Sequence, residues 1–232
     1  KKIIFTNGSR KHALNITQRI GVDRHFDDIF DIVDSDFIPK PSPEPYKKLA
    51  NQPYFLHVGV LEKRKNLGVL IKAFALFLKK FPDYKLALVG QRGPAKDLDD
   101  CENLQTLVRQ LELQAHVFFP GYASINQLKW FYENASAYTF PSIEEGFGIP
   151  VLEAFSYGLP VIVSENEAIN EIAGAGGLSA QSLDPHAWSL AMEKLINSPD
   201  LRNDLIKNGK LRLKAFSKTA FLDGIENYIA KN

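Results

Sequence analysis

The segment Phe140-Pro-Ser-Ile-Glu-Glu-Gly-Phe-Gly-Ile-Pro150 combines glycines and carboxylates in a way that suits a phosphorylated ligand. A strand-like run ends at its start, and proline is tolerated in the first turn of the helix that follows. Gly146 and Gly148 let backbone N–H groups approach a ligand closely, and the helix start adds free donors and the positive end of its dipole. The segment therefore predicts a site for a phosphate or a diphosphate.

Carboxylates and cations accompany this segment. Glu145 is placed to accept hydrogen bonds from hydroxyl groups, and Glu153 lies one turn into the following helix, directed back toward the same pocket. The run Glu62-Lys-Arg-Lys-Asn66 supplies cations for a diphosphate. Taken singly, each feature has an ordinary structural explanation: a tight turn for the glycines, a solvated helix face for Glu153 and an exposed basic run for residues 63–65. Together, each after a strand, they favour a ligand with central phosphates and hydroxyls at both ends, which describes a nucleotide sugar.

Strand-like and helical patterns alternate along the chain. The strand-like runs are short, mostly apolar on both faces and bounded by Gly, Pro or Asn, as in a buried parallel sheet. They are 3–6, 29–33, 55–58, 86–89, 117–119, 137–140 and 161–163. The helical patterns are 66–80, with Asn66 as its expected N-cap, 104–111, 125–134, 150–157, 185–197, 199–216 and 219–230.

This order predicts an α/β fold, a Rossmann-like parallel sheet with helices on both faces, preceded by an N-terminal βαβα segment. Ligands of such sheets bind beyond the carboxyl ends of the strands, so the loops that follow strands are the important ones. Those loops are 59–65, 90–93, 121–124, 141–148 and 164–170.

The bulk composition narrows the class of protein and of partner. With 232 residues, 45% hydrophobic and 24% charged, the chain is typical of a soluble globular protein. Its net charge of +1 gives no general attraction for nucleic acid or an anionic membrane.

The single cysteine, Cys101, cannot form an internal disulfide, which favours a reduced, cytoplasmic setting. No Cys/His cluster has metal-binding spacing, and no apolar run reaches the roughly 18 residues of a membrane span. The chain starts directly in a strand-like run, so we expect a fragment or a fusion product.

Glu145 and Glu153 have seven residues between them, which is the E-x7-E pattern of retaining glycosyltransferases with the two-domain GT-B fold. From residue 53 to residue 232 the chain resembles the C-terminal, donor-binding domain of glycosyltransferase family 4 (group 1). The matching segments, in the family's order and spacing, are 58–67, 88–90, 119–121, 138–153, 158–162, 170–174 and 216–217.

The resemblance implies a role for each matching residue. Lys65 and Glu145 would be catalytic: Lys65 would bind the donor diphosphate and stabilise the leaving group, and Glu145 would contact hydroxyls of the transferred sugar. Arg64 would assist Lys65, and Glu153 would hold the ribose. The other implied donor-binding residues are Gly121 and Tyr122 near the base, Gly146, Phe147 and Gly148 near the sugar and phosphate, and Gly59 and Ile149.

The resemblance also implies a UDP- or GDP-linked donor, no cofactor and no bound metal, since cations and helix dipoles neutralise the leaving diphosphate. One position departs from the family pattern. Val60 stands where many members carry Arg or Thr, which implies the loss of one charge-assisted hydrogen bond, about 1.5–3 kcal/mol, if an Arg is required there.

Residues 1–52 differ from an acceptor-binding domain and are too few to form one. Residues 1–50 resemble a fragment of a haloacid-dehalogenase-type phosphatase of the pyrimidine-nucleotidase-like branch, in which Thr6, Asn7 and Lys40 would serve the phosphate. That family's Asp-x-Asp nucleophile and late acidic pair are absent, so we expect no phosphatase activity. The segment either adds two strands and two helices to the sheet or forms a small flanking lobe. A natural fusion, a truncation artefact and an engineered chimera all fit.

Three functions follow from these observations. The first is a retaining, metal-independent glycosyltransferase in which this chain, through residues 53–232, carries the donor-binding domain. The alternative is a nucleotide-sugar-binding module that is inactive by itself because its acceptor domain is missing. The third, a phosphohydrolase, lacks its nucleophile. The expected partners are a nucleotide sugar, a carbohydrate or lipid acceptor and an N-terminal acceptor domain supplied elsewhere. The expected location is cytoplasmic, with peripheral attachment at the inner membrane as an alternative for the full-length enzyme.

Overall fold

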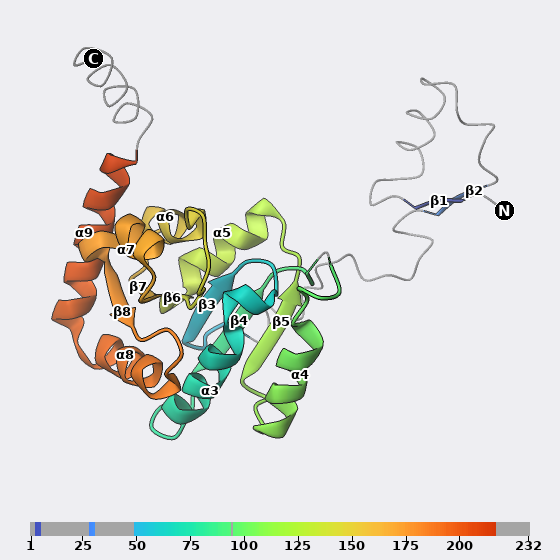
Figure 1. The fold of residues 1–232 in the computed structure, drawn as a ribbon, viewed down its shortest axis with the longest axis horizontal. Coiled ribbons are helices and arrows are strands. Elements are labelled where there is room, and N and C mark those ends of the chain that lie inside the picture. The colour runs from blue at the N-terminus through green and yellow to red at the C-terminus, as the bar shows by residue number, and fades with distance from the viewer. Residues whose placement is uncertain (1–2, 6–27, 31–48, 94, 217–232) are drawn as a thin grey trace, which may run out of the picture. The chain divides into compact units, whose positions relative to one another are not determined.

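Six parallel strands form one sheet in the computed structural model, which describes residues 3–5, 28–30, 49–93 and 95–216. Their spatial order is β5-β4-β3-β6-β7-β8 (Figure 1). The strands are β3 (Tyr54–Val58), β4 (Lys85–Val89), β5 (Val117–Gly121), β6 (Ala137–Phe140), β7 (Val161–Ser164) and β8 (Gly177–Ala180). The chain builds outward from β3 on one side and then from β6 on the other. The carboxyl ends of β3 and β6 therefore border the point where the winding reverses, the usual ligand position in such sheets.

Helices cover both faces of this sheet, which confirms the predicted Rossmann-like α/β architecture (Figure 1). The helices are α3 (Leu67–Leu78), α4 (Cys101–Gln110), α5 (Ile125–Asn134), α6 (Ile149–Ser156), α7 (Glu167–Ala173), α8 (Pro185–Asn197) and α9 (Pro199–Ala215), with 3-10 turns η2 (Lys63–Lys65) and η3 (Gly174–Gly176). One buried core joins α3, α4 and α8 to the sheet, and a second joins α5, α6 and α7 to its other face. None of the described helices is long and apolar enough to cross a membrane.

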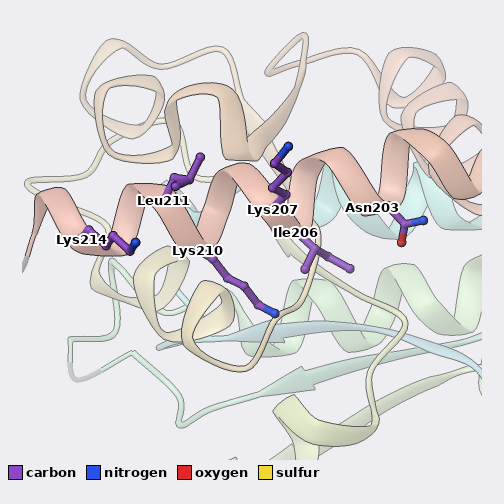
Figure 2. Close-up of a pocket in the computed structure, with 6 residues that line it drawn as sticks. All are labelled: Asn203, Ile206, Lys207, Lys210, Leu211 and Lys214. Atoms are coloured by element: carbon purple, nitrogen blue, oxygen red, sulfur yellow. The ribbon is translucent and has the colours of Figure 1, made fainter.

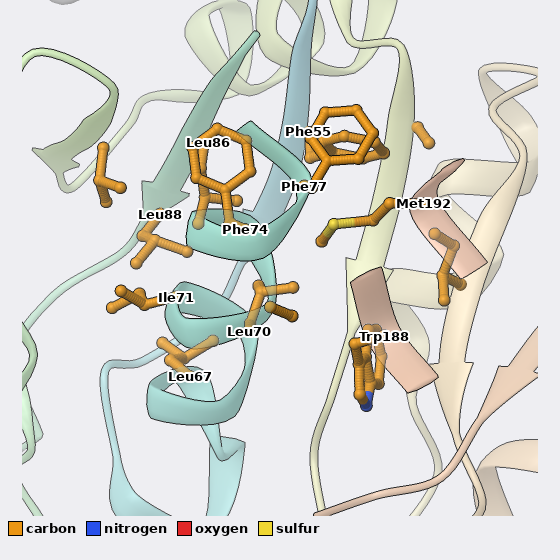
Figure 3. Packing of buried hydrophobic residues seen from close by; sticks show 14 of the residues in the cluster. Phe55, Leu67, Leu70, Ile71, Phe74, Phe77, Leu86, Leu88, Trp188 and Met192 are labelled. Carbon is orange, nitrogen blue, oxygen red and sulfur yellow. The ribbon is translucent and has the colours of Figure 1, made fainter. Parts of the chain in front are cut away.

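The apolar stripe of α3 forms the centre of the first core. Phe77 packs edge-on against Phe55 of β3 at 5.2 Å between ring centres and stacks on Phe81 at 4.5 Å. Trp188 and Met192 of α8 face this stripe and are fully buried (Figure 3). Aromatic rings of this size contribute much of the apolar area that a domain removes from water, so this packing fixes α3, and the cation turn before it, against the sheet.

Two elements differ from the sequence-based predictions. The prediction of a loop over residues 164–170 is wrong in its second half, because α7 begins at Glu167. The Asn166 side chain caps this helix by accepting a hydrogen bond from the Ile169 amide at 3.2 Å. Strand β8 was not predicted at all. Seven helical residues give little periodicity, and β8 begins with Gly177 and contains no β-branched residue, so neither sequence carries a clear local signal.

The N-terminal residues contribute a separate pair of strands. β1 (Ile3–Phe5) and β2 (Asp28–Phe30) are parallel and form their own two-stranded sheet, so they do not extend the sheet of six. The chain divides into two compact units, Lys1–Glu44 and Pro45–Asn232. The predicted domains 1–52 and 53–232 stay a prediction. The predicted N-terminal helices, the residues Thr6, Asn7 and Lys40, and the helix at 219–230 lie outside the described residues.

Candidate functional site

Lys65 and Glu145 meet where the loops after β3 and β6 come together. The Lys65 ammonium donates to Oε1 of Glu145, and the two side chains are only 8% and 11% exposed. The ammonium also lies 5.3 Å from the centre of the Phe140 ring. A buried cation needs a paired anion, so each side chain holds the other in place. The structure thus brings together the two residues for which the resemblance implies catalytic roles.

Arg64 borders this pair on the solvent side. Its Nη1 lies 3.3 Å from Oε2 of Glu145, and its Nε donates to the buried Glu62 at 2.7 Å. Desolvation opposes the Arg64 cation, yet the two carboxylates raise the pKa of its guanidinium above the ordinary value. Arg64 and Lys65 therefore present two adjacent cations, an arrangement that suits the oxygen atoms of a diphosphate.

Glu145 is an anion at neutral pH. Burial works to raise the pKa of its carboxyl, but the Lys65 ammonium, the buried Ser142 hydroxyl and the Arg64 guanidinium together hold that pKa below the ordinary value. An ionised carboxylate accepts hydrogen bonds through both oxygens. Glu145 can thus either pair with the two cations or accept hydroxyl groups of a ligand.

Asn66 fixes the turn that carries the cations. Its φ of 54° lies in the left-handed region, which Asn adopts more readily than most residues. Its side-chain amide donates to the carbonyls of Pro141 at 3.3 Å and Ser182 at 2.7 Å. Asn66 stands at the predicted N-cap position, but the capping hydrogen bond expected there is absent. Its side chain instead links the cation turn to the glycine loop and to the chain after β8.

The glycine loop leads into α6 much as the sequence predicts. Gly148 has a φ of 87° and is the N-cap of α6, which begins at Ile149 with Pro150 in its first turn. The free donors of this helix start therefore point out of the sheet edge next to Glu145. No atom of a non-neighbouring residue lies within 4 Å of the place where a side chain on Gly146 would begin, so this backbone is open to a ligand.

Phe147 is anchored by the end of α9. Its ring lies 5.6 Å from that of Phe216, at an interplanar angle of 87°. The Arg212 guanidinium lies over the other ring of this pair, 4.8 Å from the centre of Phe216. Phe147 and Ile149 are nevertheless 46% and 60% exposed. The loop is thus held from behind while it presents apolar surface at the site.

The loops after β3 and β4 approach each other closely at two glycines. Gly59 donates its amide to Val89 at 2.9 Å, and a side chain on Gly90 would begin only 1.7 Å from the Gly59 carbonyl oxygen. Gly90 also has a φ of 152°, which other residues rarely adopt. The predicted residue Gly59 therefore lies beside Lys65, whose Cε is 3.8 Å from the place where a Gly59 side chain would begin.

Glu153 has a protein partner that the sequence did not indicate. Its Oε2 accepts a hydrogen bond from the Tyr132 hydroxyl of α5 at 2.9 Å. The Tyr132 ring stacks on that of Tyr157 with 5.1 Å between centres and 3° between planes. The helical period of α5 could have shown that Tyr132 faces the sheet, but not which residue of α6 it meets.

Three predicted or considered residues lie apart from the Lys65–Glu145 cluster. Lys63 is exposed and donates to the Asp97 carbonyl, so only two of the three cations in its run reach Glu145. Gly121, with a φ of 77°, and Tyr122, 59% exposed, follow β5. Within the described ranges, no hydrogen bond or ion pair joins them to the cluster.

His57 is a residue of this region that the sequence reasoning missed. It is fully buried in β3, and its Nδ1 lies 3.0 Å from the Thr139 carbonyl. Burial, reinforced by the Lys65 cation and only partly offset by the Thr139 carbonyl and Glu145, lowers its pKa to about 4. Nδ1 thus carries the proton, and Nε2 has no hydrogen-bond partner in the described structure. A histidine inside an otherwise apolar strand was the available signal.

A hollow along α9 lies away from these residues. It is lined by Asn203, Ile206, Lys207, Lys210, Leu211 and Lys214, whose side chains spread along one helix (Figure 2). None of the predicted site residues lines it, and it holds no carboxylate. We therefore place the site at the cluster of Lys65 and Glu145, on the chemistry of their side chains. Among the described residues, no group of three or more His, Cys, Asp and Glu side chains could hold a metal ion.

Comparison with known proteins gives one family. Residues 40–212 match the model of the family described as glycosyl transferases group 1. O-antigen chain mannosyltransferase B of Escherichia coli is 33% identical over 190 residues, which are 79% of this chain and 48% of that protein. O-antigen chain mannosyltransferase RfbU of Salmonella typhimurium is 36% identical over 166 residues, 72% of this chain and 42% of that protein. The chain thus spans about half the length of the curated relatives it matches.

Solved structures agree with this family. The C-terminal domain of a glycosyl transferase group 1 family protein (LpcC) from Francisella tularensis superposes with a TM-score of 0.62 at 27% identity, over 71% of this chain and 85% of that one. Anabaena Alr3699/HepE, solved with UDP and glucose, superposes with a TM-score of 0.69 at 18% identity, over 99% of this chain and 71% of that one. The second likeness shows the fold.

Proposed function

This chain belongs to the glycosyl transferases group 1 family, and on that premise we propose that residues 53–232 are the donor-binding domain of a retaining, metal-independent glycosyltransferase. The observation that carries the proposal is the cluster of Lys65, Arg64 and Glu145 at the start of α6. Two cations and a helix start stabilise the charge that develops on a leaving diphosphate, and they do so without a bound metal.

In this proposal, Glu145 changes its binding partner when a donor binds. The carboxylate pairs with the Lys65 ammonium, and a diphosphate that reaches Lys65 competes with it for the same cation. Once Lys65 contacts the diphosphate, Glu145 is free to accept hydroxyls of the sugar. Exposed Tyr122 and open Gly121 after β5 receive the base, and Glu153 receives the ribose. The donor is UDP- or GDP-linked, and GDP-mannose is the first to test because the two relatives are named mannosyltransferases.

Calorimetric titration of the chain with UDP and GDP tests this proposal. We expect one nucleotide to bind, and we expect Lys65→Ala and Glu153→Ala each to weaken it about tenfold or more, the loss of one charged contact. Lys63→Ala is the matched control, because Lys63 contacts the Asp97 carbonyl instead of the cluster and its removal should leave the affinity within twofold. If neither nucleotide binds at millimolar concentration, the site assignment is wrong.

A second candidate is a nucleotide-sugar-binding module without activity of its own. It describes the chain tested by itself, which spans about half the length of its relatives. Transfer requires both halves of a two-domain enzyme to enclose the donor. A donor hydrolysis assay separates the two. Turnover above background supports the transferase, whereas nucleotide binding without turnover supports the module. The acceptor, a carbohydrate or a lipid, and a cytoplasmic location belong to the proposal for the whole protein.

For residues 1–52 we propose a haloacid-dehalogenase-like segment that has no phosphatase activity. This assignment rests on the order of the segments: the one Asp-x-Asp run within residues 1–52, Asp34-Ser-Asp36, follows the Thr6-Asn7 segment and does not precede it. We expect hydrolysis of a phosphomonoester such as p-nitrophenyl phosphate to stay at the background rate with added Mg²⁺. Hydrolysis that is lost on Lys40→Ala would instead support the phosphohydrolase.

A further inference from the structure

The hydrogen bond between Tyr132 and Glu153 joins two helices at the edge of the proposed donor site. We propose that Tyr132 is a positioning residue that aims Glu153 at the 2′- and 3′-hydroxyls of the donor ribose, so that the site selects ribonucleotides over 2′-deoxyribonucleotides. This inference rests on the proposed function, because it assigns a specificity to the same pocket. The hydroxyl of Tyr132 donates to Oε2 of Glu153 at 2.9 Å.

The Tyr132 ring is held rigidly. It is 2% exposed, stacks on Tyr157 at 5.1 Å and lies at 38° to the Tyr138 ring, 5.8 Å away. Tyr138 is itself fixed, since its hydroxyl donates to the Val58 carbonyl at 3.1 Å. A buried ring that packs against two other rings cannot turn its hydroxyl away, so the Glu153 carboxylate is oriented before a ligand arrives. Such preorganisation raises affinity because less side-chain freedom is lost on binding.

The direction of this hydrogen bond is also settled. Burial first, and then the nearby Tyr138 and Glu153, raise the pKa of Tyr132 well above its ordinary value. The phenol therefore keeps its proton and donates it to Oε2. Within the described part of the chain, Oε1 of Glu153 accepts no hydrogen bond, and the carboxylate takes part in no ion pair. Glu153 is exposed, so this oxygen faces solvent and can accept the two hydroxyls of a ribose together with the remaining lone pair of Oε2.

Helix α5 connects this contact to the place proposed for the base. α5 begins after Ser124, two positions beyond Tyr122, and the side chains of Ser124 and Gln127 form a reciprocal capping box there. The amide of Ser124 donates to the Gln127 side chain at 2.8 Å. The residues proposed to meet the base and the tyrosine that orients Glu153 thus belong to one capped helix and its approach. The residues proposed to contact the base and the tyrosine that orients the ribose-binding carboxylate therefore move together.

Affinity for paired nucleotides tests the inference. UDP against 2′-deoxy-UDP, and GDP against 2′-deoxy-GDP, are titrated into the full chain and into Tyr132→Phe, which keeps the ring stack and removes only the hydroxyl. We expect the wild-type chain to prefer the ribonucleotide about tenfold, which corresponds to about 1.4 kcal/mol. In Tyr132→Phe the preference should fall to about threefold or less, through weaker ribonucleotide binding with the deoxynucleotide little changed.

Tyr157→Phe is the matched control, because it removes a hydroxyl from the same stack without touching Glu153, and it should keep the wild-type preference. Equal weakening of both nucleotides in Tyr132→Phe overturns the inference and marks a purely structural bond. An unchanged preference overturns it as well. If Tyr132→Phe does not fold, Glu153→Gln takes its place with the same expected loss of preference. Nucleotide binding without any ribose preference in the wild-type chain rejects the inference alone, whereas no binding of either base rejects the proposed function.

Discussion

The ammonium of Lys65 and the carboxylate of Glu145 are in direct contact although the two residues are 80 positions apart in the sequence. One follows β3 and the other follows β6, neighbouring strands at the reversal of the winding. The contact therefore depends on the topology of the sheet, and it sets a cation and an anion side by side at the candidate site.

Glu145→Gln should separate these roles. The change removes the charge that competes for Lys65, so binding of a nucleoside diphosphate should tighten by about three- to tenfold, roughly 1 kcal/mol. Sugar transfer or donor hydrolysis by the same variant should fall, because the amide accepts hydroxyls less well. Calorimetry with UDP and GDP measures the first effect. Weaker binding by Glu145→Gln would mean that the carboxylate supports the phosphate site instead of competing with it.

Phe216→Ala should loosen the glycine loop from behind. The edge-on contact with Phe147 is worth about 0.5–1.5 kcal/mol beyond simple burial, so we expect a lower melting temperature and a severalfold weaker nucleotide affinity. Leu211→Ala is the control on the same helix, since Leu211 is 54% exposed and should cost little of either. Unchanged nucleotide affinity in folded Phe216→Ala would show that the loop holds its shape without this ring.

Asn66→Ala and Asn66→Gly together separate two contributions of Asn66 to stability: its side-chain hydrogen bonds and its tolerance of a left-handed backbone. Both lose the hydrogen bonds to the Pro141 and Ser182 carbonyls, while only Ala also opposes the φ of 54°. We expect Asn66→Ala to lower the free energy of unfolding by about 2–3 kcal/mol and Asn66→Gly by about 1 kcal/mol less than that. Denaturant titration measures both. Equal losses would mean that the left-handed backbone costs nothing at this position.

His57 should make stability depend on pH. Its folded pKa of about 4 lies below the ordinary 6.5, so the unfolded chain binds the proton more readily in this range. The resulting stabilisation is fully present above pH 6.5 and is lost as the pH falls toward 4, about 3 kcal/mol in all.

His57→Gln, whose amide can still donate to the Thr139 carbonyl, should remove this part of the pH dependence. Urea titrations between pH 7 and pH 4 measure it. His186→Gln, at an exposed position of α8, should keep the wild-type slope. A slope that is the same in His57→Gln and in the wild-type chain would show that His57 is not buried in its neutral form.

The sequence predicts much of the fold because its strongest patterns are also its buried ones. The apolar runs at β3, β4 and β6 lie in the sheet, and α5 and α8 have the bounds that their caps and periodicity predict. The spacing of Glu145 and Glu153 places one carboxylate before a helix start and the other one turn inside it, which local sequence determines. The short α7 and β8 carry too few patterned residues to be recognised.

The contacts of the site could be predicted only in part. The family resemblance implies that Lys65 and Glu145 serve one ligand, but it does not give their direct contact. That Lys63 turns to the Asp97 carbonyl depends on the local backbone of η2. The Tyr132 contact with Glu153 joins two helices whose relative rotation is set by packing against the sheet. Such facts arise from tertiary packing, and no pattern within either helix contains them.

The close approach of Gly90 to the Gly59 carbonyl limits how this pocket can be redesigned. Because no side chain fits at Gly90, the contact between the loops after β3 and β4 cannot be varied by substitution at that position. If the proposed donor site is correct, sugar or base preference is open to change at its exposed positions, such as Tyr122, Phe147 and Ile149. A library aimed at new donors should therefore vary those three positions and leave both glycines untouched.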